Sequence, residues 1–110
     1  MKNKSVKGQI MSTWKVIHTK EFEKSLKRLS HDIARRVLGK IYVLEDDPFV
    51  GKPLRSIYAV IDDNKYRVYS LRIGNYRVAY IIETLEKKVY LLLADHRGRI
   101  YRELKKLFKS

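Results

Sequence analysis

The fold of this chain is decided by residues 66–83, which read YRVYSLRIGNYRVAYIIE. Apolar and polar residues alternate on both sides of Gly74-Asn75. Alternation with a period of two is typical of β-strands, and a two-residue link that contains glycine is a strong signal for a hairpin. We therefore predict antiparallel strands over Tyr66–Ile73 and Tyr76–Glu83.

A third strand is predicted over Lys88–Asp95, after a turn near Glu86-Lys87. Its centre, Val89–Ala94, is apolar at every position except Tyr90. Such a run is typical of a central strand that is covered on both faces. The other features predicted outside the helices are a short strand at Trp14–His18, a loop at Phe49–Leu54, a short extended piece at Arg55–Ile61 and a turn at Asp62-Asp63-Asn64.

Three segments repeat apolar residues at intervals of three and four, which predicts helices. Thr19 can cap the first helix and Ser30 the second, and Pro48 ends the second. The short link between the two implies an antiparallel helical hairpin. The apolar stripes are Phe22, Leu26 and Leu29 in the first helix, Ile33, Val37, Ile41 and Leu44 in the second, and Leu104, Leu107 and Phe108 in a closing helix over Ile100–Phe108.

The predicted order of elements is therefore β-α-α-β-β-β-α. A length of 110 residues leaves room for one hydrophobic core. We predict a single α+β domain, in which an N-terminal strand and an antiparallel helical hairpin pack on a mainly antiparallel four-stranded sheet and a short C-terminal helix follows. The opposite face of the sheet is expected to be open. Residues 1–10 are expected to form a flexible basic tail, and residues 11–110 the domain.

The charge of the chain points to a polyanionic partner. The sequence holds 25 basic and 12 acidic residues, for a net charge of +13. A field of this sign attracts nucleic acid, the ribosome or an acidic protein. The absence of cysteine excludes disulfides and thiolate chemistry. The apolar runs are too short to cross a bilayer and no secretory signal begins the chain, so we expect no membrane partner and a cytoplasmic location.

The arginines beside the hairpin are the first candidate site. Alternation places Arg72 and Arg77 on the same face of the sheet, close to the turn. Arg97 and Arg99 follow the central strand and can reach the same end. The planar guanidinium fork matches two oxygens of a phosphate. The sequence alone allows either an anion site here or two solvated arginines beside a turn.

His96 is the histidine with the best setting for proton transfer, although a lone histidine can equally be structural. The three histidines lack metal-ligand spacing, and the sequence contains no nucleotide-binding loop. We therefore expect no metal and no cofactor. A metal-free ribonuclease stays open because RNA supplies its own nucleophile, the 2′-hydroxyl. His96 and Tyr101 are the candidate proton donors and acceptors.

Three segments together resemble the RelE/ParE superfamily of toxins from toxin–antitoxin systems. They are LRIGNYRVAY at residues 71–80, HRGRIY at residues 96–101 and KPLR at residues 52–55. The resemblance extends over about Thr13 to Phe108. It implies a small basic protein that enters the ribosomal A site, cleaves mRNA without a metal, arrests growth and is held inactive by a cognate antitoxin, with a toxin–antitoxin heterotetramer as one expected assembly.

The resemblance also implies roles for individual residues. Arg77 corresponds to an arginine that contacts the scissile phosphate, and Arg97 to one that stabilises the transition state. Tyr101 corresponds to a tyrosine that stacks on or protonates the substrate. Together with His96 these form the expected catalytic set, and the expected RNA-binding set is Arg55, Lys65, Arg72 and Arg99.

One departure from the family pattern concerns the general base. Some members carry two lysines on the strand before the turn, where this chain has Val68 and Ser70. Either His96, Lys65 or another basic group takes over, or the activity is weaker. Retention of the arginines and the tyrosine favours the RelE branch. Two alternatives stay open: a ParE-like toxin that binds a topoisomerase without cutting RNA, and a non-cleaving protein that binds RNA or the ribosome.

Overall fold

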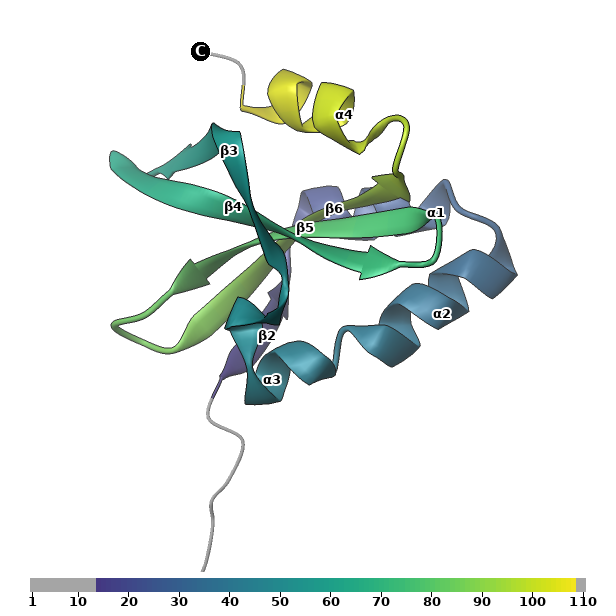
Figure 1. Cartoon of the computed structure of the whole chain (residues 1–110), viewed down its shortest axis with the longest axis horizontal. Coiled ribbons are helices and arrows are strands. Elements are labelled where there is room, and N and C mark those ends of the chain that lie inside the picture. The colour runs from purple at the N-terminus through teal and green to yellow at the C-terminus, as the bar shows by residue number, and fades with distance from the viewer. Residues whose placement is uncertain (1–13, 109–110) are drawn as a thin grey trace, which may run out of the picture.

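A computed structural model describes residues 14–108 of the chain (Figure 1). The basic tail predicted at residues 1–10 lies outside this range. The helices are α1 (Lys20–Lys27), α2 (His31–Lys40), α3 (Val43–Asp46) and α4 (Ile100–Leu107), with a 3₁₀ turn, η1, at Pro48–Val50. The strands are β2 (Lys15–His18), β3 (Lys52–Ile61), β4 (Asn64–Ile73), β5 (Tyr76–Glu83) and β6 (Lys88–His96). The predicted order β-α-α-β-β-β-α is met except that one more strand, β3, precedes the hairpin and the second predicted helix is divided into α2 and α3.

The sheet has five strands in the order β2-β6-β5-β4-β3. All neighbouring pairs are antiparallel except β2 and β6, which run parallel. The predicted α+β class and the interior position of β6 are therefore confirmed, but the prediction of four strands is wrong. The fifth strand is β3 (Lys52–Ile61), which includes the second half of the segment predicted as a loop and the whole of the predicted extended piece.

Strand β3 can hold Pro53 because it lies at the edge of the sheet, where a missing N–H costs no central ladder bond. Its register against β4 shifts between Pro53 and Tyr58. The strand then turns into β4 through Asp62 and Asp63, whose φ values are 52° and 66°. Two successive residues with positive φ are the mark of a type I′ hairpin, in which aspartate is well tolerated.

The hairpin between β4 and β5 forms as the sequence predicts. Ile73 pairs with Tyr76, so Gly74 and Asn75 are the two loop residues. Gly74 has φ of 60°. A type II′ turn requires positive φ at its first loop position, which glycine adopts without steric cost. This turn fixes the register that places Arg72 directly opposite Arg77.

One face of the sheet is covered by α1, α2 and α3 (Figure 1). The Thr19 hydroxyl caps α1 by accepting from the Phe22 amide at 3.2 Å, and Ser30 caps α2 by accepting from the Ile33 amide at 3.3 Å. Buried Ser25 donates to the Phe22 carbonyl and accepts from the Ala94 amide of β6, at 2.7 and 2.9 Å. These bonds satisfy buried polar groups and fix α1 against the centre of the sheet.

The second predicted helix is divided in two. Helix α2 ends at Lys40, and a turn at Ile41 and Tyr42 leads into the four-residue α3. Ile41 and Leu44 are both buried in the cluster beneath the helices, as predicted. The predicted apolar stripe is therefore buried even though the helix is divided.

The opposite face of the sheet is not open as predicted. A second apolar cluster covers it, with Val68, Ala79 and Ile81 from the sheet and Ile100 and Leu104 from α4. Figure 1 shows α4 on the side of the sheet away from α2 and α3. The apolar stripe of α4 predicts this packing, but the sequence does not show which face receives it. The polar end of this face, at the β4–β5 hairpin, stays exposed.

Across residues 14–108 the model contains no helix that is both long enough and apolar enough to span a bilayer.

Candidate anion-binding cleft

A cleft of about 440 Å³ lies where β3, β4, β5 and α4 meet. We call it the arginine cleft. Its side chains include two arginines, one lysine, one serine and one tyrosine, and no carboxylate. The lining residues are Val50, Gly51, Lys52, Ser70, Leu71, Arg72, Arg77 and Tyr101. A concave site with convergent cationic groups suits an anion.

Arg72 and Arg77 are direct cross-strand partners in this cleft. The Arg77 guanidinium donates to the Gly74 and Tyr76 carbonyls at 3.0 and 2.9 Å, which holds it against the hairpin turn. Neither arginine takes part in any ion pair found within residues 14–108. Like charges directly opposite each other destabilise a sheet. A bound anion between them would relieve this repulsion.

Arg97 reaches the hairpin end through its backbone. Its amide donates to the Asn75 carbonyl at 2.8 Å, two residues from Arg77. The Arg97 side chain is exposed and does not line the cleft. Arg99 instead pairs with Asp95 at 3.4 Å, so part of its charge is already neutralised. The predicted convergence of arginines is met for Arg72 and Arg77, whereas Arg97 is joined to the hairpin end only through its backbone.

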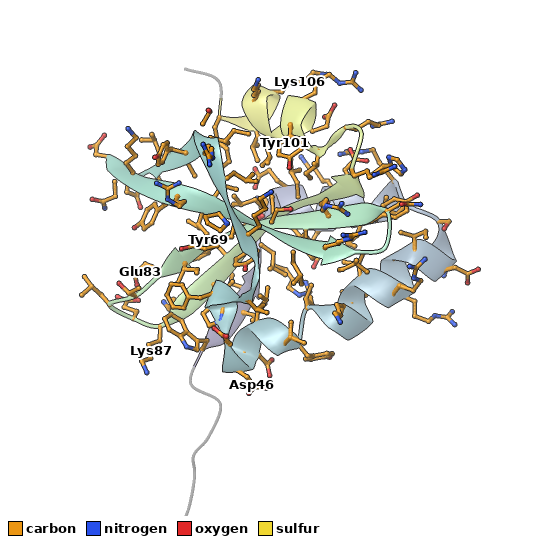
Figure 2. The ribbon with its side chains drawn as sticks, in the orientation of Figure 1. Asp46, Tyr69, Glu83, Lys87, Tyr101 and Lys106 are labelled. Atoms are coloured by element: carbon orange, nitrogen blue, oxygen red, sulfur yellow. The ribbon has the colours of Figure 1, made fainter. Side chains whose placement is uncertain are left out.

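Tyr101, in the first turn of α4, connects the arginine cleft to a second hollow. Figure 2 shows this side chain at the edge of α4 nearer the sheet, with Lys106 on the far side. The second hollow, of about 350 Å³, is lined by Arg55 and Lys105 among others, and it shares Lys52 and Tyr101 with the arginine cleft. Tyr101 is 46% exposed. Its phenol is therefore accessible to a molecule in either hollow.

His96 does not share the site with the arginines, so the expected grouping is wrong. It pairs with Tyr76 on the helical side of the sheet, where the two rings meet edge to face at 5.3 Å. Its Nδ1 accepts from the Gly98 amide at 3.1 Å. It lines a separate pocket of about 300 Å³ together with Arg28 and Arg99. Side chains of successive strand residues point to opposite faces, which puts His96 on the face away from Arg77.

Lys65 also lies away from the arginine cleft, near the other end of β4. Its ammonium sits 4.6 Å from the centre of the Tyr58 ring. Arg67 donates to the Leu54 carbonyl and to the Tyr58 hydroxyl, both at 3.0 Å. These contacts tie β4 to the irregular part of β3. They give Arg67 a structural role. Lys65 lies about seven strand residues, or roughly 20 Å, from Arg72 along β4.

The wall of the cleft is fixed by Tyr80. This side chain is fully buried, and its hydroxyl donates to the Pro48 carbonyl at 2.7 Å and accepts from the Gly51 amide at 3.0 Å. Burial raises the pKa of the Tyr80 phenol well above its usual range, so it stays a neutral donor. The two bonds hold the segment that leads directly into Lys52.

Two positions in the arginine cleft were missed by reasoning from the sequence. Lys52 falls in the segment predicted as a loop, and Ser70 was noted only as a departure from the family pattern. They are direct cross-strand partners. Arg36 of α2 was also missed: its Nη2 would lie 2.6 Å from a β-carbon at Gly74. No sequence signal reveals such neighbours, since each depends on strand register or helix docking.

The described part of the chain, residues 14–108, shows no cluster of three potential metal ligands.

Comparison with known proteins gives consistent matches. A family model described as the ParE toxin of type II toxin–antitoxin systems, parDE, matches residues 16–101. Toxin RelG of Mycobacterium tuberculosis is 33% identical over 91 residues, which cover 77% of this chain and 97% of that protein.

Solved structures agree with these sequence matches. A chain of the RelBE2 toxin–antitoxin complex from Mycobacterium tuberculosis is 29% identical, with a TM-score of 0.64, and the match covers 83% of this chain and 99% of that one. A chain of the archaeal RelE–RelB complex from Pyrococcus horikoshii is 26% identical, with a TM-score of 0.60 and coverage of 79% and 98%. The fold predicted from the sequence is confirmed by these likenesses.

Proposed function

Because this chain belongs to the ParE toxin family of type II toxin–antitoxin systems, within the RelE/ParE superfamily, we propose that it is a toxin that cleaves mRNA on the ribosome. The observation that carries this proposal is the arginine cleft. Arg72 and Arg77 oppose each other and take part in none of the ion pairs found within residues 14–108, although Asp95 is the cross-strand neighbour of Arg77 on β6; Tyr101 lines the same cleft. We infer that this arrangement suits a phosphodiester, because both arginines line one concave site and a guanidinium matches two phosphate oxygens.

The proposed reaction is attack by the 2′-hydroxyl of RNA on the adjacent phosphorus. It yields a 2′,3′-cyclic phosphate and a 5′-hydroxyl, and it needs no metal because the nucleophile belongs to the substrate. Negative charge grows on the phosphoryl oxygens in the transition state, where preorganised donors act most strongly. Arg77 is preorganised by its two carbonyl bonds. Arg97, whose backbone joins the hairpin end, would add a further guanidinium to those of Arg72 and Arg77, and Tyr101 would protonate the leaving oxygen or stack on a base.

The proposal includes an antitoxin partner and action in the cytoplasm. The structures from Mycobacterium tuberculosis and Pyrococcus horikoshii are of complexes with antitoxins. A net charge of +13 also favours an acidic segment that folds on binding. Addition of the cognate antitoxin to the purified protein should therefore abolish inhibition of translation once the molar ratio of antitoxin to toxin reaches that of their complex.

A cell-free translation extract provides the test of cleavage. Primer extension on a translated mRNA should show cuts that require both the protein and active translation, with 5′-hydroxyl ends. Arg77→Ala should reduce the cleavage rate by at least about 100-fold, the cost of losing one preorganised charge-stabilising donor. Arg35→Ala removes an exposed arginine from α2 and is the matched control. Equal cleavage rates for Arg77→Ala and wild type would show that Arg77 has no catalytic role.

The name of the matching family favours one other activity enough to test it. A ParE-like toxin would block a topoisomerase and leave mRNA intact. A DNA supercoiling assay with gyrase, run beside the primer extension, separates the two activities. Inhibition of supercoiling without mRNA cuts would replace the proposed function. Salt-sensitive RNA binding without either effect would instead identify a non-cleaving binder.

A further inference from the structure

The turn that joins β6 to α4 is made of His96, Arg97, Gly98 and Arg99. The His96 carbonyl accepts from the Arg99 amide at 2.9 Å, which is the hydrogen bond of a β-turn. Arg97 holds the second position, and its amide donates to the Asn75 carbonyl at 2.8 Å. The backbone of Arg97 is therefore fastened to the loop of the β4–β5 hairpin.

The His96 imidazole adds a side-chain hydrogen bond to this turn. Its Nδ1 accepts from the Gly98 amide, two residues along the chain, at 3.1 Å. A backbone amide can only donate, so Nδ1 carries no hydrogen and the proton of the neutral ring lies on Nε2. A side-chain acceptor bonded to the amide two residues later is the pattern of an Asx turn, which asparagine and aspartate form with an oxygen. Here a ring nitrogen takes the place of that oxygen.

The elements on either side of the turn are held by other contacts. Ile100 and Leu104 of α4 are buried in the second apolar cluster, and β6 stays paired with β5 as far as His96. The imidazole bond spans a single residue, Arg97, which lies between its two ends. Loss of the bond to Gly98 would therefore loosen Arg97 more than it would displace α4 or β6.

The charged and titratable groups around the imidazole come from three parts of the chain. Asp95 and Arg99 flank it on its own segment, Arg28 at the end of α1 lines the same pocket, and Tyr76 of β5 meets the ring edge to face at 5.3 Å. Asp95 and Arg99 pair with each other at 3.4 Å. Addition of a proton to Nδ1 would break its bond with the Gly98 amide, because both ring nitrogens of a charged imidazole are donors.

We propose that His96 is a positioning residue of this toxin, an inference that rests on the proposed function. Its neutral imidazole, bonded to the Gly98 amide, holds the turn in the conformation that keeps Arg97 at the end of the β4–β5 hairpin, beside Arg77. A proton on Nδ1 releases the turn, so the toxin is less active in acid than at neutral pH. In this role His96 touches no substrate and transfers no proton to it.

Two substitutions separate the hydrogen bond from the ring. His96→Ala removes the acceptor and should lower the single-turnover cleavage rate on ribosomes that carry mRNA by about tenfold or more, because a small misplacement of a reacting or stabilising group is costly. His96→Asn offers an oxygen to the Gly98 amide, as in an Asx turn, and should keep the rate within about threefold of wild type. His31→Ala, which removes an exposed histidine from the start of α2, is the matched control and should cleave at the wild-type rate. Circular dichroism melting checks that each variant folds.

The pH profile is a readout that a purely structural role would not change. Asparagine does not titrate, so the ratio of the wild-type rate to the His96→Asn rate should fall as pH decreases from about 8 to about 5.5, the range in which histidine gains its proton. At the acid end this ratio should approach that of His96→Ala to His96→Asn. The ratio cancels the pH dependence of the ribosome, the mRNA and every other group of the toxin. A constant ratio would overturn the proposed acid sensitivity.

A double-mutant cycle tests whether His96 acts through Arg97. In an Arg97→Ala background, His96→Ala should cause no further loss of rate, because the side chain that it positions is already gone. In a Tyr101→Phe background it should cause its full loss again, because α4 is held by its own apolar contacts. Multiplicative losses in the Arg97→Ala background, or wild-type cleavage by His96→Ala alone, would overturn the proposal.

Hydrogen exchange followed by NMR separates failure of this inference from failure of the proposed function. The Gly98 amide should exchange about fivefold faster in His96→Ala than in wild type or His96→Asn, whether or not the protein cleaves RNA; equal exchange would overturn the role of the imidazole in the turn. If the wild type makes no translation-dependent cuts, the endonuclease function fails and the positioning role fails with it. If the wild type cuts and Arg77→Ala does not, while His96→Ala cuts normally, the function stands and His96 alone is rejected.

Discussion

At the scale of single residues, Tyr80 shows how a buried polar group supports the cleft. Its hydroxyl satisfies the Pro48 carbonyl and the Gly51 amide from the interior of the sheet. Loss of one partner of a buried hydrogen bond costs more than the bond contributes, since the remaining groups lose water without a replacement. Tyr80 therefore stabilises both the fold and the geometry of Lys52.

Tyr80→Phe should lower the free energy of unfolding by about 1–3 kcal/mol, because it leaves both groups without their partner. Urea denaturation followed by circular dichroism measures the change. Tyr101→Phe removes a half-exposed hydroxyl and should leave stability within about 0.5 kcal/mol of wild type. An unchanged midpoint for Tyr80→Phe would show that water replaces the phenol.

The raised pKa of Tyr80 also predicts a pH dependence of stability. Below about pH 10 the phenol is protonated in both states, and its contribution is fully present. Above that value the unfolded chain releases the proton while the folded protein keeps it, so the free energy of unfolding falls as pH rises. Wild type should therefore lose stability more steeply than Tyr80→Phe as pH rises from about 10 to about 12 in denaturant titrations; parallel curves would contradict this.

Two glycines offer a matched pair of stability tests. A β-carbon at Gly51 would lie 2.2 Å from the Tyr80 hydroxyl oxygen and 2.9 Å from the Ser70 carbonyl oxygen, so Gly51→Ala should be strongly destabilising. A β-carbon at Gly39 in α2 meets no atom within 4 Å. Gly39→Ala should instead stabilise the protein by about 0.5–1 kcal/mol through its helix propensity. Thermal melting of the two variants should move in opposite directions.

The site was partly predictable from the sequence at this scale. Alternation about a two-residue turn was enough to place Arg72 and Arg77 on one face, because both the period and the turn are local. Lys52 could not be found in this way, since its relation to Ser70 depends on the register between two strands. His96 was grouped with the arginines because chain proximity does not distinguish the two faces of a sheet.

At the scale of elements, local sequence signals predicted the helices and hairpins better than they predicted how these elements pack together. The capping residues Thr19 and Ser30 fixed the starts of α1 and α2. Strand β3 was missed in part because Gly51 and Pro53 are typical of loops, and an edge strand tolerates them only when its neighbour is known. The packing of α4 on the second face of the sheet was not predicted, because an amphipathic stripe indicates that a helix packs against a core but not which face of the sheet it covers.

Helix α4 is predicted to couple stability to catalysis. Leu104 is fully buried in the second cluster, and α4 carries Tyr101 three residues earlier. Leu104→Ala should cost about 2–5 kcal/mol, because it leaves a cavity under the helix. Cleavage should fall as well, since Tyr101 would no longer be held at the cleft. Lys106→Ala, on the far side of α4, should change neither the urea midpoint nor the cleavage rate.

At the scale of the whole molecule, the sheet divides the protein into two differently built sides. The helical side buries the larger aromatic core, with Phe22 and Tyr80. The α4 side buries smaller aliphatic residues and ends in the arginine cleft. The net charge of +13 was readable from composition, whereas the meeting of Arg72 and Arg77 in one cleft required the fold.

This charge distribution predicts a salt dependence for RNA binding. Affinity for single-stranded RNA should fall as salt rises, because each phosphate contact releases a counterion. The Arg72→Ala and Arg77→Ala double variant should reduce the slope of log Kd against log salt by about 1.4, at roughly 0.7 per contact. Fluorescence anisotropy from 50 to 300 mM KCl measures it. An unchanged slope would place the RNA elsewhere on the basic surface.

The position of Tyr80 has a consequence for genetic work on this protein. Arg77 and Tyr80 belong to the same short sequence string, three residues apart on β5. A selection for cells that survive toxin expression would recover substitutions at both positions, and survival alone would suggest one shared role. Immunoblots of soluble protein would separate the two roles. Cells that survive through a change at Arg77 would accumulate intact toxin, whereas in cells that survive through a change at Tyr80 the destabilised toxin would be degraded by proteases.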